Sequence, residues 1–232
     1  MKKIALSSAT LITLMVAPSA FADFKKPQFY GGAQAGGTFA MSSLKMDSRS
    51  GGAPVGFVDQ QIKQKRERDF FSAGVFAGFR FCLTEFFTGL EVEGNWDGMN
   101  IKFDTPHPNA GFSWRTEIKR KYQIIPSLTV GWKATEKASL YAKFGAGISK
   151  FSIKTEVGDP SQRGQNRTII HFVPALGAEY EVHENAALRF EVSGEVFGPQ
   201  IKSENVAGPA TFQSTKTQYH SLSAKLGVLL KV

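Results

Sequence analysis

The sequence has very little cysteine and no long apolar run after its first 22 residues. Cys82 is the only cysteine among 232 residues, which excludes an intrachain disulfide and a zinc site built from clustered cysteines. No later apolar run approaches the ~18–20 residues that a membrane-spanning helix needs. The basic residues do not form one stripe with interleaved aromatic residues, so we expect no nucleic-acid partner.

The N-terminus has the three parts of a secretory signal peptide. Lys2 and Lys3 form a positive region, residues 4–16 are mainly apolar, and Ala20-Phe21-Ala22 is a cleavage site of the A-x-A kind. We therefore predict a cleaved signal peptide at 1–22 and a mature domain at 23–232. The formal net charge is +8. Because the first 22 residues hold two lysines and no acid, the mature domain would carry +6.

Apolar and polar residues alternate through most of the remaining chain. Residues 175–195, ALGAEYEVHENAALRFEVSGE, show this alternation twice, before and after the polar tripeptide HEN. Leu176 and Tyr180 share one face before the tripeptide, and Leu188 and Phe190 share one face after it. A period of two is typical of β-strands with one apolar and one polar face, and the polar tripeptide between them predicts a hairpin turn.

The alternating runs and their connections predict an all-β fold. Eight runs are present, near 28–46, 70–83, 86–103, 114–133, 139–151, 168–182, 188–195 and 221–232. Long polar connections, such as 47–69 and 203–215, alternate with short turns, such as 135–137. This rhythm is typical of outer-membrane barrels, which have long extracellular loops and short periplasmic turns. We predict a single closed antiparallel eight-stranded transmembrane β-barrel.

The polar face of these strands carries too many charges to meet lipid. A Lys or Arg on the lipid face costs about 2–4 kcal/mol at the bilayer midplane, whereas opposite charges can pair in a narrow lumen. We therefore predict a lumen charge network of Arg80, Glu91, Glu93, Lys121, Lys143, Glu179, Glu181, Arg189, Glu191, Glu195 and Lys225. Register counting places Glu181 opposite Arg189. Pro126 and Pro174 predict a bulge or a local break, because proline cannot donate to a ladder.

Two segments in the second half of the chain share a further pattern. They are 139–151, SLYAKFGAGISKF, and 174–192, PALGAEYEVHENAALRFEV, with key positions Tyr141, Gly145, Gly147, Gly177, Glu179, Tyr180, Asn185, Leu188, Arg189 and Glu191. With the alternating C-terminal strand, they resemble the OmpA-like and opacity-protein-like outer-membrane barrels. The resemblance implies a bacterial outer-membrane location, insertion by the outer-membrane assembly machinery, and binding of a host-cell or serum ligand. It also implies a terminal Phe or Trp, where this chain has Val232.

The polar connections are the candidate binding surfaces. The longest, 47–69, ends in KQKRERD, where Lys63, Lys65, Arg66 and Arg68 stand among two acids. Such a loop suits sulfated glycans, lipopolysaccharide phosphates or an acidic host surface. The alternative is a solvated hairpin extension above the membrane. We expect a structural or adhesive barrel, in contact with outer-membrane lipid and lipopolysaccharide, without enzymatic activity or cofactor.

Other functions stay open. A gated narrow channel would use the lumen charges as switching ion pairs, although an eight-stranded barrel is normally filled by side chains. A soluble, secreted lipocalin-like ligand binder would need an apolar pocket inside. A lipid A-modifying enzyme would need a His and a Ser side by side. His220 and Ser221 are adjacent in a predicted strand, so their side chains should lie on opposite faces.

Overall fold

The computed structural model describes residues 27–51, 57–106, 113–157, 159–196, 201–206 and 211–232. The signal-peptide prediction lies outside these residues. No helix in the described ranges is long and apolar enough to cross a membrane. The strands are β1 (Gln28–Gly51), β2 (Phe57–Cys82), β3 (Phe86–Asp97), β4 (Asn100–Pro106), β5 (Ser113–Lys133), β6 (Ala138–Val157), β7 (Asp159–His183), β8 (Ala186–Val196), β9 (Ile201–Val206) and β10 (Thr211–Lys231).

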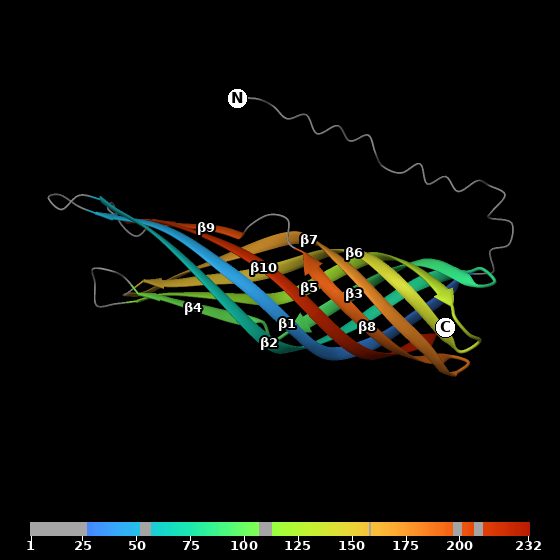
Figure 1. The fold of residues 1–232 in the computed structure, drawn as a ribbon. Helices are drawn as coiled ribbons and strands as arrows, with labels where there is room; N and C mark the ends of the chain where they lie inside the picture. Colours follow the sequence, from blue (N-terminus) through green and yellow to red (C-terminus); the bar gives the residue numbers. More distant parts are fainter. Residues whose placement is uncertain (1–26, 52–56, 107–112, 158, 197–200, 207–210) are drawn as a thin grey trace, which may run out of the picture.

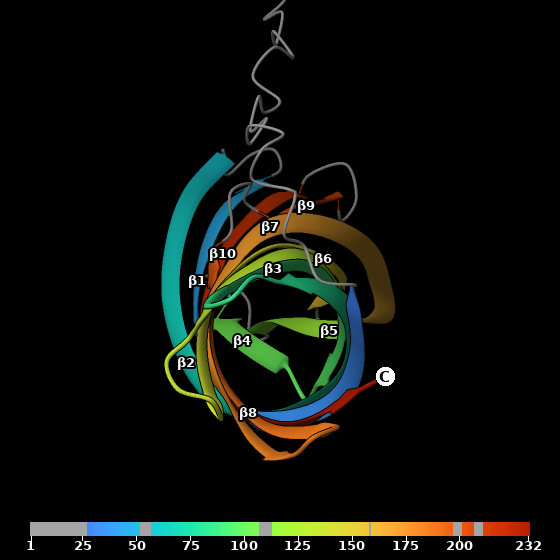
Figure 2. The same cartoon turned by 90° about the vertical axis from the view of Figure 1, so that its right-hand side faces the viewer.

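These ten segments occupy eight positions around one barrel. β3 and β4 pair one after the other with β5, so they are two parts of one interrupted strand. β8 and β9 are related in the same way through β10. The order β1-β2-β3-β5-β6-β7-β8-β10 closes through the β1–β10 pairing, and Figure 2 shows the ring nearly end on. The closed antiparallel eight-stranded barrel predicted from the alternation is confirmed.

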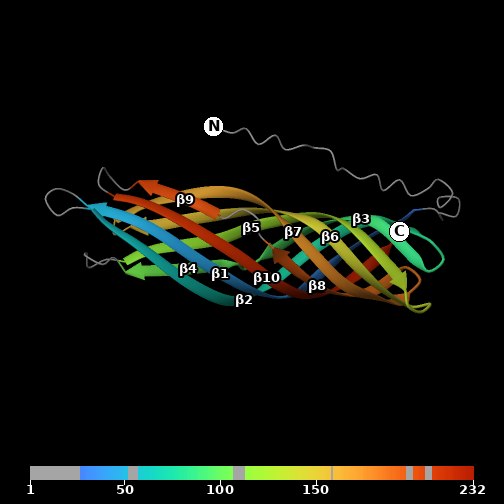
Figure 3. The same cartoon turned by 45° about the horizontal axis from the view of Figure 1, so that its top comes forward.

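The two ends of the barrel differ. Tight connections at 83–85, 134–137 and 184–185 gather at one end, on the right in Figure 1, which we call the turn end. At the opposite, distal end, β1 continues to Gly51 and β2 begins at Phe57, in one unbroken register. The expected loop at 47–69 was therefore placed wrongly, because strand covers most of it. Figure 3 shows β1, β2, β4 and β9 continuing into this distal projection.

The apolar face of the strands points outward in one half of the barrel and inward in the other half. Toward the turn end, large apolar side chains face outward, with Leu176 69%, Leu226 68% and Phe71 67% exposed, while charges face inward. In the distal projection, apolar side chains face inward instead. We call this buried cluster the apolar cap; it consists of Ala40, Leu44, Met99, Ile101, Phe103, Ile118, Phe151, Ile153, Ile169 and Tyr219. An outward apolar face suits a barrel wall surrounded by lipid, and an inward apolar face suits a wall surrounded by water.

The two prolines inside strands interrupt the ladder locally. The β5–β6 pairing passes over Pro126 and resumes at Ser127 in the same register. The β7–β8 pairing passes over Pro174 and resumes at Ala175 in the same way. Of the two alternatives predicted for these prolines, the structure has the local break and not the bulge.

A seam lies between β2 and β4 in the distal projection. Backbone pairing between β2 and its neighbour β3 begins at Ser72. Beyond it, side chains bridge the two edges: Arg68 Nη1 donates to the Asn100 carbonyl oxygen at 2.6 Å, and Gln64 Nε2 donates to the Asp104 carbonyl oxygen at 3.0 Å. Charged side chains along such an edge hinder pairing with other chains.

Candidate functional site

The centre of the lumen is organised around the ammonium group of Lys143. Its Nζ lies 3.0 Å from Glu91 Oε1, 2.9 Å from Glu93 Oε2 and 2.8 Å from Glu191 Oε2. These side chains come from β3, β6 and β8, and all of them are almost completely buried. Three carboxylates that converge in this way could hold a metal ion, but the ammonium group already supplies the positive charge there.

Arg189 links the same cluster to the turn end. Its Nη1 lies 2.8 Å from Glu91 Oε2, and its Nη2 lies 2.9 Å from Glu179 Oε1. Glu179 is also bound by Arg80 Nη1 at 2.6 Å. The guanidinium of Arg189 stacks 4.2 Å from the centroid of the Phe76 ring, a cation–π contact. Arg80, Glu179, Arg189, Glu91 and Lys143 thus form one continuous chain of charge-assisted hydrogen bonds.

The remaining space in the lumen is closely filled. Lys225 Nζ lies 2.6 Å from Glu93 Oε1 and 3.0 Å from Asn95 Oδ1. Tyr141 donates its hydroxyl to Glu191 at 3.0 Å. Gly177 makes room for this ring, since a Cβ at residue 177 would lie 2.2 Å from Tyr141 Cζ. The lumen near the turn end is therefore a packed polar core.

The structure places nine of the eleven predicted lumen residues among the buried polar side chains: Arg80, Glu91, Glu93, Lys143, Glu179, Arg189, Glu191, Glu195 and Lys225. Glu181 is only partly buried and pairs with Lys231 near the turn end. It does not face Arg189. Glu179 is the residue opposite Arg189, so the predicted pairing was wrong by two residues, and the register shift between Glu181 and His183 accounts for one of them.

Lys121 is a correction to the predicted network. The β5–β6 register shifts between Arg120 and Tyr122, so Lys121 is the extra residue of a bulge and points outward, exposed. Arg120 occupies the lumen instead. Its Nη1 lies 2.7 Å from Glu195 Oε2, and its Nη2 forms an ion pair with Asp97. Strict alternation could not reveal this, because a bulge inserts one residue without any change of pattern on the partner strand.

A second polar layer surrounds Arg120, just below the apolar cap. Gln123 Nε2 donates to Glu195 Oε1 at 3.0 Å and lies 2.9 Å from His171 Nε2. The Arg120 guanidinium lies 5.8 Å from the centroid of the Tyr219 ring, which belongs to the cap. The interior therefore changes from a charged cluster, through a layer that mixes the Arg120 ion pairs with neutral polar side chains, to the apolar cap at the distal end.

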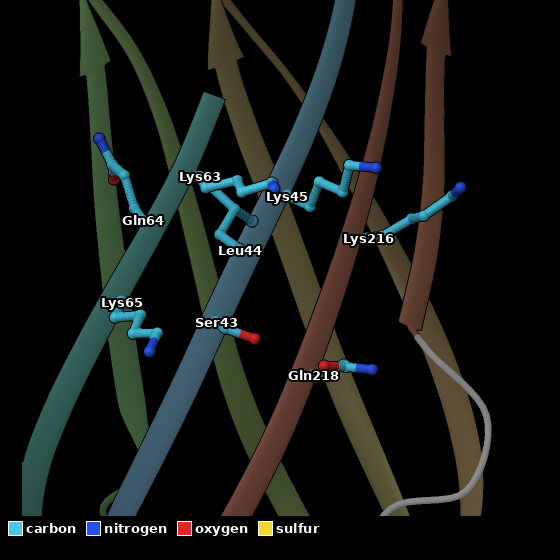
Figure 4. A pocket seen from close by; sticks show the side chains of 8 residues that line it. All are labelled: Ser43, Leu44, Lys45, Lys63, Gln64, Lys65, Lys216 and Gln218. Carbon is cyan, nitrogen blue, oxygen red and sulfur yellow. The ribbon is translucent and has the colours of Figure 1, made fainter. Parts of the chain in front are cut away.

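The distal projection carries a basic surface on its outside. Lys45 on β1 is paired directly with Lys63 on β2 and with Lys216 on β10. In the next row toward the turn end, Ser43 is paired with Lys65. We call Lys45, Lys63, Lys65 and Lys216 the lysine face. All four line a hollow of about 260 Å³, and Figure 4 shows their side chains on three neighbouring strands.

The lysine face overlaps only partly with the basic loop predicted from the sequence. Lys63 and Lys65 belong to it, but they lie on β2 and not in a loop. Arg68 reaches toward Asn100 at the seam, and Arg66 is exposed but does not line the hollow. Lys45 and Lys216 were missed because they are distant in sequence, and only the strand register brings them beside Lys63.

His220 and Ser221 lie as a strand requires, with His220 exposed and Ser221 8% exposed on the inner side. The two side chains therefore point to opposite faces and do not form a nucleophile–base pair. His171 lies inside the barrel, 4% exposed, beside Gln123. His183 lies at the turn end, where its Nδ1 accepts from the Asn185 N–H at 3.3 Å. His107 lies outside the described residues.

Comparison with known proteins places this barrel in a family. A family model described as the outer membrane protein beta-barrel domain matches residues 7–228. The chain belongs to this family. A comparison with curated protein sequences finds no match.

Solved outer-membrane barrels are similar to this chain, and two of them, with TM-scores above 0.5, share its fold. The outer membrane protease OmpT from Escherichia coli is 11% identical, with 90% of this chain and 98% of that chain covered and a TM-score of 0.52. The outer membrane protein OprG from Pseudomonas aeruginosa is 15% identical, with 87% and 96% covered and a TM-score of 0.53. Neisserial surface protein A is 15% identical, with 86% and 99% covered and a TM-score of 0.41. Sequence identities this low indicate a similar fold and give no information about function.

Membership of the outer membrane protein beta-barrel domain family explains the exposed apolar band. The outward-facing Leu, Phe and Val side chains of the turn-end half form the surface that meets lipid in such barrels. The charged interior stands behind this surface, and the distal projection continues beyond it. The lumen near the turn end is filled by the buried charged side chains, and Lys63 and Lys65 are exposed on the outer face of the projection.

Proposed function

We propose that this protein is a non-enzymatic barrel of the bacterial outer membrane that binds anionic ligands through its lysine face. The observation that carries the proposal is the row of Lys63, Lys45 and Lys216 on three neighbouring strands. Like charges directly opposite each other destabilise a sheet. A bound anion relieves this repulsion, so the row favours sulfated or phosphorylated ligands, including an acidic host-cell or serum molecule.

The direction of the barrel supports an outward-facing lysine face. Outer-membrane barrels have their short turns on the periplasmic side. With the connections 83–85, 134–137 and 184–185 in the periplasm, the distal projection extends from the cell surface. Its strands present Lys45, Lys63 and Lys216 on a rigid sheet, which holds the charges in place better than a loop would.

The filled interior favours a binding role over a channel. An ion crossing the barrel would have to separate buried pairs such as Lys143–Glu191 and Arg120–Glu195, and then pass the apolar cap. A buried charge that loses its partner is destabilising by about 3–5 kcal/mol. The apolar cap adds a desolvation cost, because its side chains provide no partner for an ion.

The proposal is tested by binding of heparin, a sulfated polyanion, to the purified protein in detergent micelles. We expect the double variant Lys63→Glu, Lys216→Glu to lose at least tenfold in affinity in low salt. The matched control is Lys133→Glu, Lys137→Glu, which changes the net charge equally at the turn end, where both lysines are exposed. An equal loss in both variants would show that only net charge matters and would contradict a lysine-face site.

A further inference from the structure

An open groove lies on the same three strands as the lysine face and also reaches Val192 of β8, closer to the turn end. It has a volume of about 770 Å³, and its lining includes Gly37 and Phe39 of β1, Phe71 of β2, and Leu222 and Ala224 of β10. Phe71 is 67% exposed and Leu222 is 57% exposed. The groove therefore lies at the distal edge of the apolar band, where a barrel in a membrane meets the acyl chains of the outer leaflet.

Gly37 leaves the groove open. A Cβ at residue 37 would meet nothing within 4 Å, so this glycine is not required by close packing inside the barrel. It is paired with Phe71 on one side and with Ala224 on the other. Small residues beside an aromatic ring form a channel in which a flexible hydrocarbon chain can lie and bury apolar surface.

The distance between the groove and the lysine face sets the length that a lipid headgroup needs to reach both. Along β1, Ser43 and Lys45 follow Phe39 by four and six residues, which is about 13 and 20 Å of strand. Asp69, which lines the groove at its end toward the lysines, is paired with Phe39, and Glu67, beyond the groove, is paired with Met41. The two carboxylates repel a phosphate that lies directly above the acyl chain. A headgroup long enough to pass them reaches the lysines.

We propose that groove and lysine face together bind one phosphorylated glycolipid, of the chemistry of lipopolysaccharide. One acyl chain lies in the groove beside Gly37, and phosphates or acidic sugars of the headgroup contact Lys65, Lys63 and Lys45. This inference rests on the proposed function, since it names the anionic ligand of the same lysine face. It also assigns a role to the groove, which binding of a soluble polyanion does not require.

The experiment compares intact lipopolysaccharide with its fully deacylated carbohydrate. Binding of each to the purified protein is measured by native mass spectrometry after detergent release. We expect intact lipopolysaccharide to bind at least tenfold more tightly, since two buried methylenes are already worth about tenfold. Gly37→Leu, which fills the groove, should remove this advantage without affecting the deacylated ligand. Lys63→Glu, Lys65→Glu should weaken both ligands, about fivefold or more per lysine.

Gly94→Leu is the matched control. Gly94 also faces outward with nothing within 4 Å of a built Cβ, but it lies on β3, away from the groove. The Gly94→Leu variant should bind intact and deacylated lipopolysaccharide with the same affinities as the unmodified protein. Phosphatidylglycerol, which has an acyl chain but a short headgroup, should bind at least tenfold more weakly than lipopolysaccharide.

Three results would overturn the inference: equal affinity for intact and deacylated ligand, equal effects of Gly37→Leu and Gly94→Leu, or equal binding of phosphatidylglycerol. In each case a lysine-dependent heparin affinity would leave the proposed function standing. A different result is that the lysine substitutions leave heparin affinity unchanged, while Gly37→Leu still removes the preference for intact lipopolysaccharide. The groove would then bind lipid, while both the polyanion site and the role of the lysines in the glycolipid site would fail.

Discussion

At the scale of single residues, the lumen depends most on Lys143. Replacement by Met removes the cation that three buried carboxylates share, those of Glu91, Glu93 and Glu191. Loss of one partner of a buried ion pair costs about 3–5 kcal/mol, because the remaining charges stay buried. We therefore expect Lys143→Met to lower the free energy of unfolding by about that amount, measured by urea unfolding in detergent with the gel shift between folded and boiled protein.

An exposed ion pair provides the control for this prediction. Arg115 and Asp104 are 2.8 Å apart, but their side chains are 54% and 49% exposed. Exposed pairs contribute about 0–1 kcal/mol, so Arg115→Ala should leave the unfolding midpoint nearly unchanged. Comparable stability of Lys143→Met and Arg115→Ala would mean that the lumen charges are solvated and not a packed core.

At the scale of elements, β6 passes through both halves of the barrel. Phe144 faces outward in the apolar band and is 51% exposed, whereas Phe151 faces inward in the apolar cap and is 0% exposed. Truncating a buried Phe costs about 3–5 kcal/mol. We expect Phe151→Ala to open the distal projection to added protease, while the membrane part still shows the folded gel mobility.

Phe144→Ala is the matched change on the same strand. It removes an outward side chain from the apolar band, far from the cap, and should leave protease resistance of the projection unchanged. Equal cleavage in both variants would argue against a separately packed cap. Cleavage in neither would show that the backbone pairing of β5, β6 and β7 holds the projection without it.

The elements also show how far sequence reasoning reaches. Alternation predicted the barrel and its turns because the band near the turn end has one apolar and one polar face throughout, as in Leu176 and Glu179. It failed from about residue 47 to 69, because KQKRERD has the composition of a loop and shows no alternation of apolar and polar residues, although it lies on β2. The prediction for Lys121 was wrong for another reason, because the position of a bulge depends on how β5 pairs with β6 and not on the β5 sequence alone.

At the scale of the whole molecule, a charged layer, a polar layer and an apolar layer fill the interior in series. The cap contains no ion pair, so an exchange of ion-pair partners would leave it in place. We expect the purified protein in planar lipid bilayers to show no conductance steps above the lipid background, with a general porin as positive control. Reproducible steps that require the protein would favour a gated narrow channel instead.

The orientation of the molecule decides whether the lysine face can meet any surface ligand. Lys63 lies in the distal projection and Lys137 at the turn end, and both are exposed. In a Cys82→Ser background, Lys63→Cys should react with a membrane-impermeant maleimide on intact cells, because distal strands project outward. Lys137→Cys should react only after the outer membrane is permeabilised. The reverse labelling pattern would place the lysine face in the periplasm, where neither a host molecule nor outer-leaflet glycolipid reaches it, and would refute both binding proposals together.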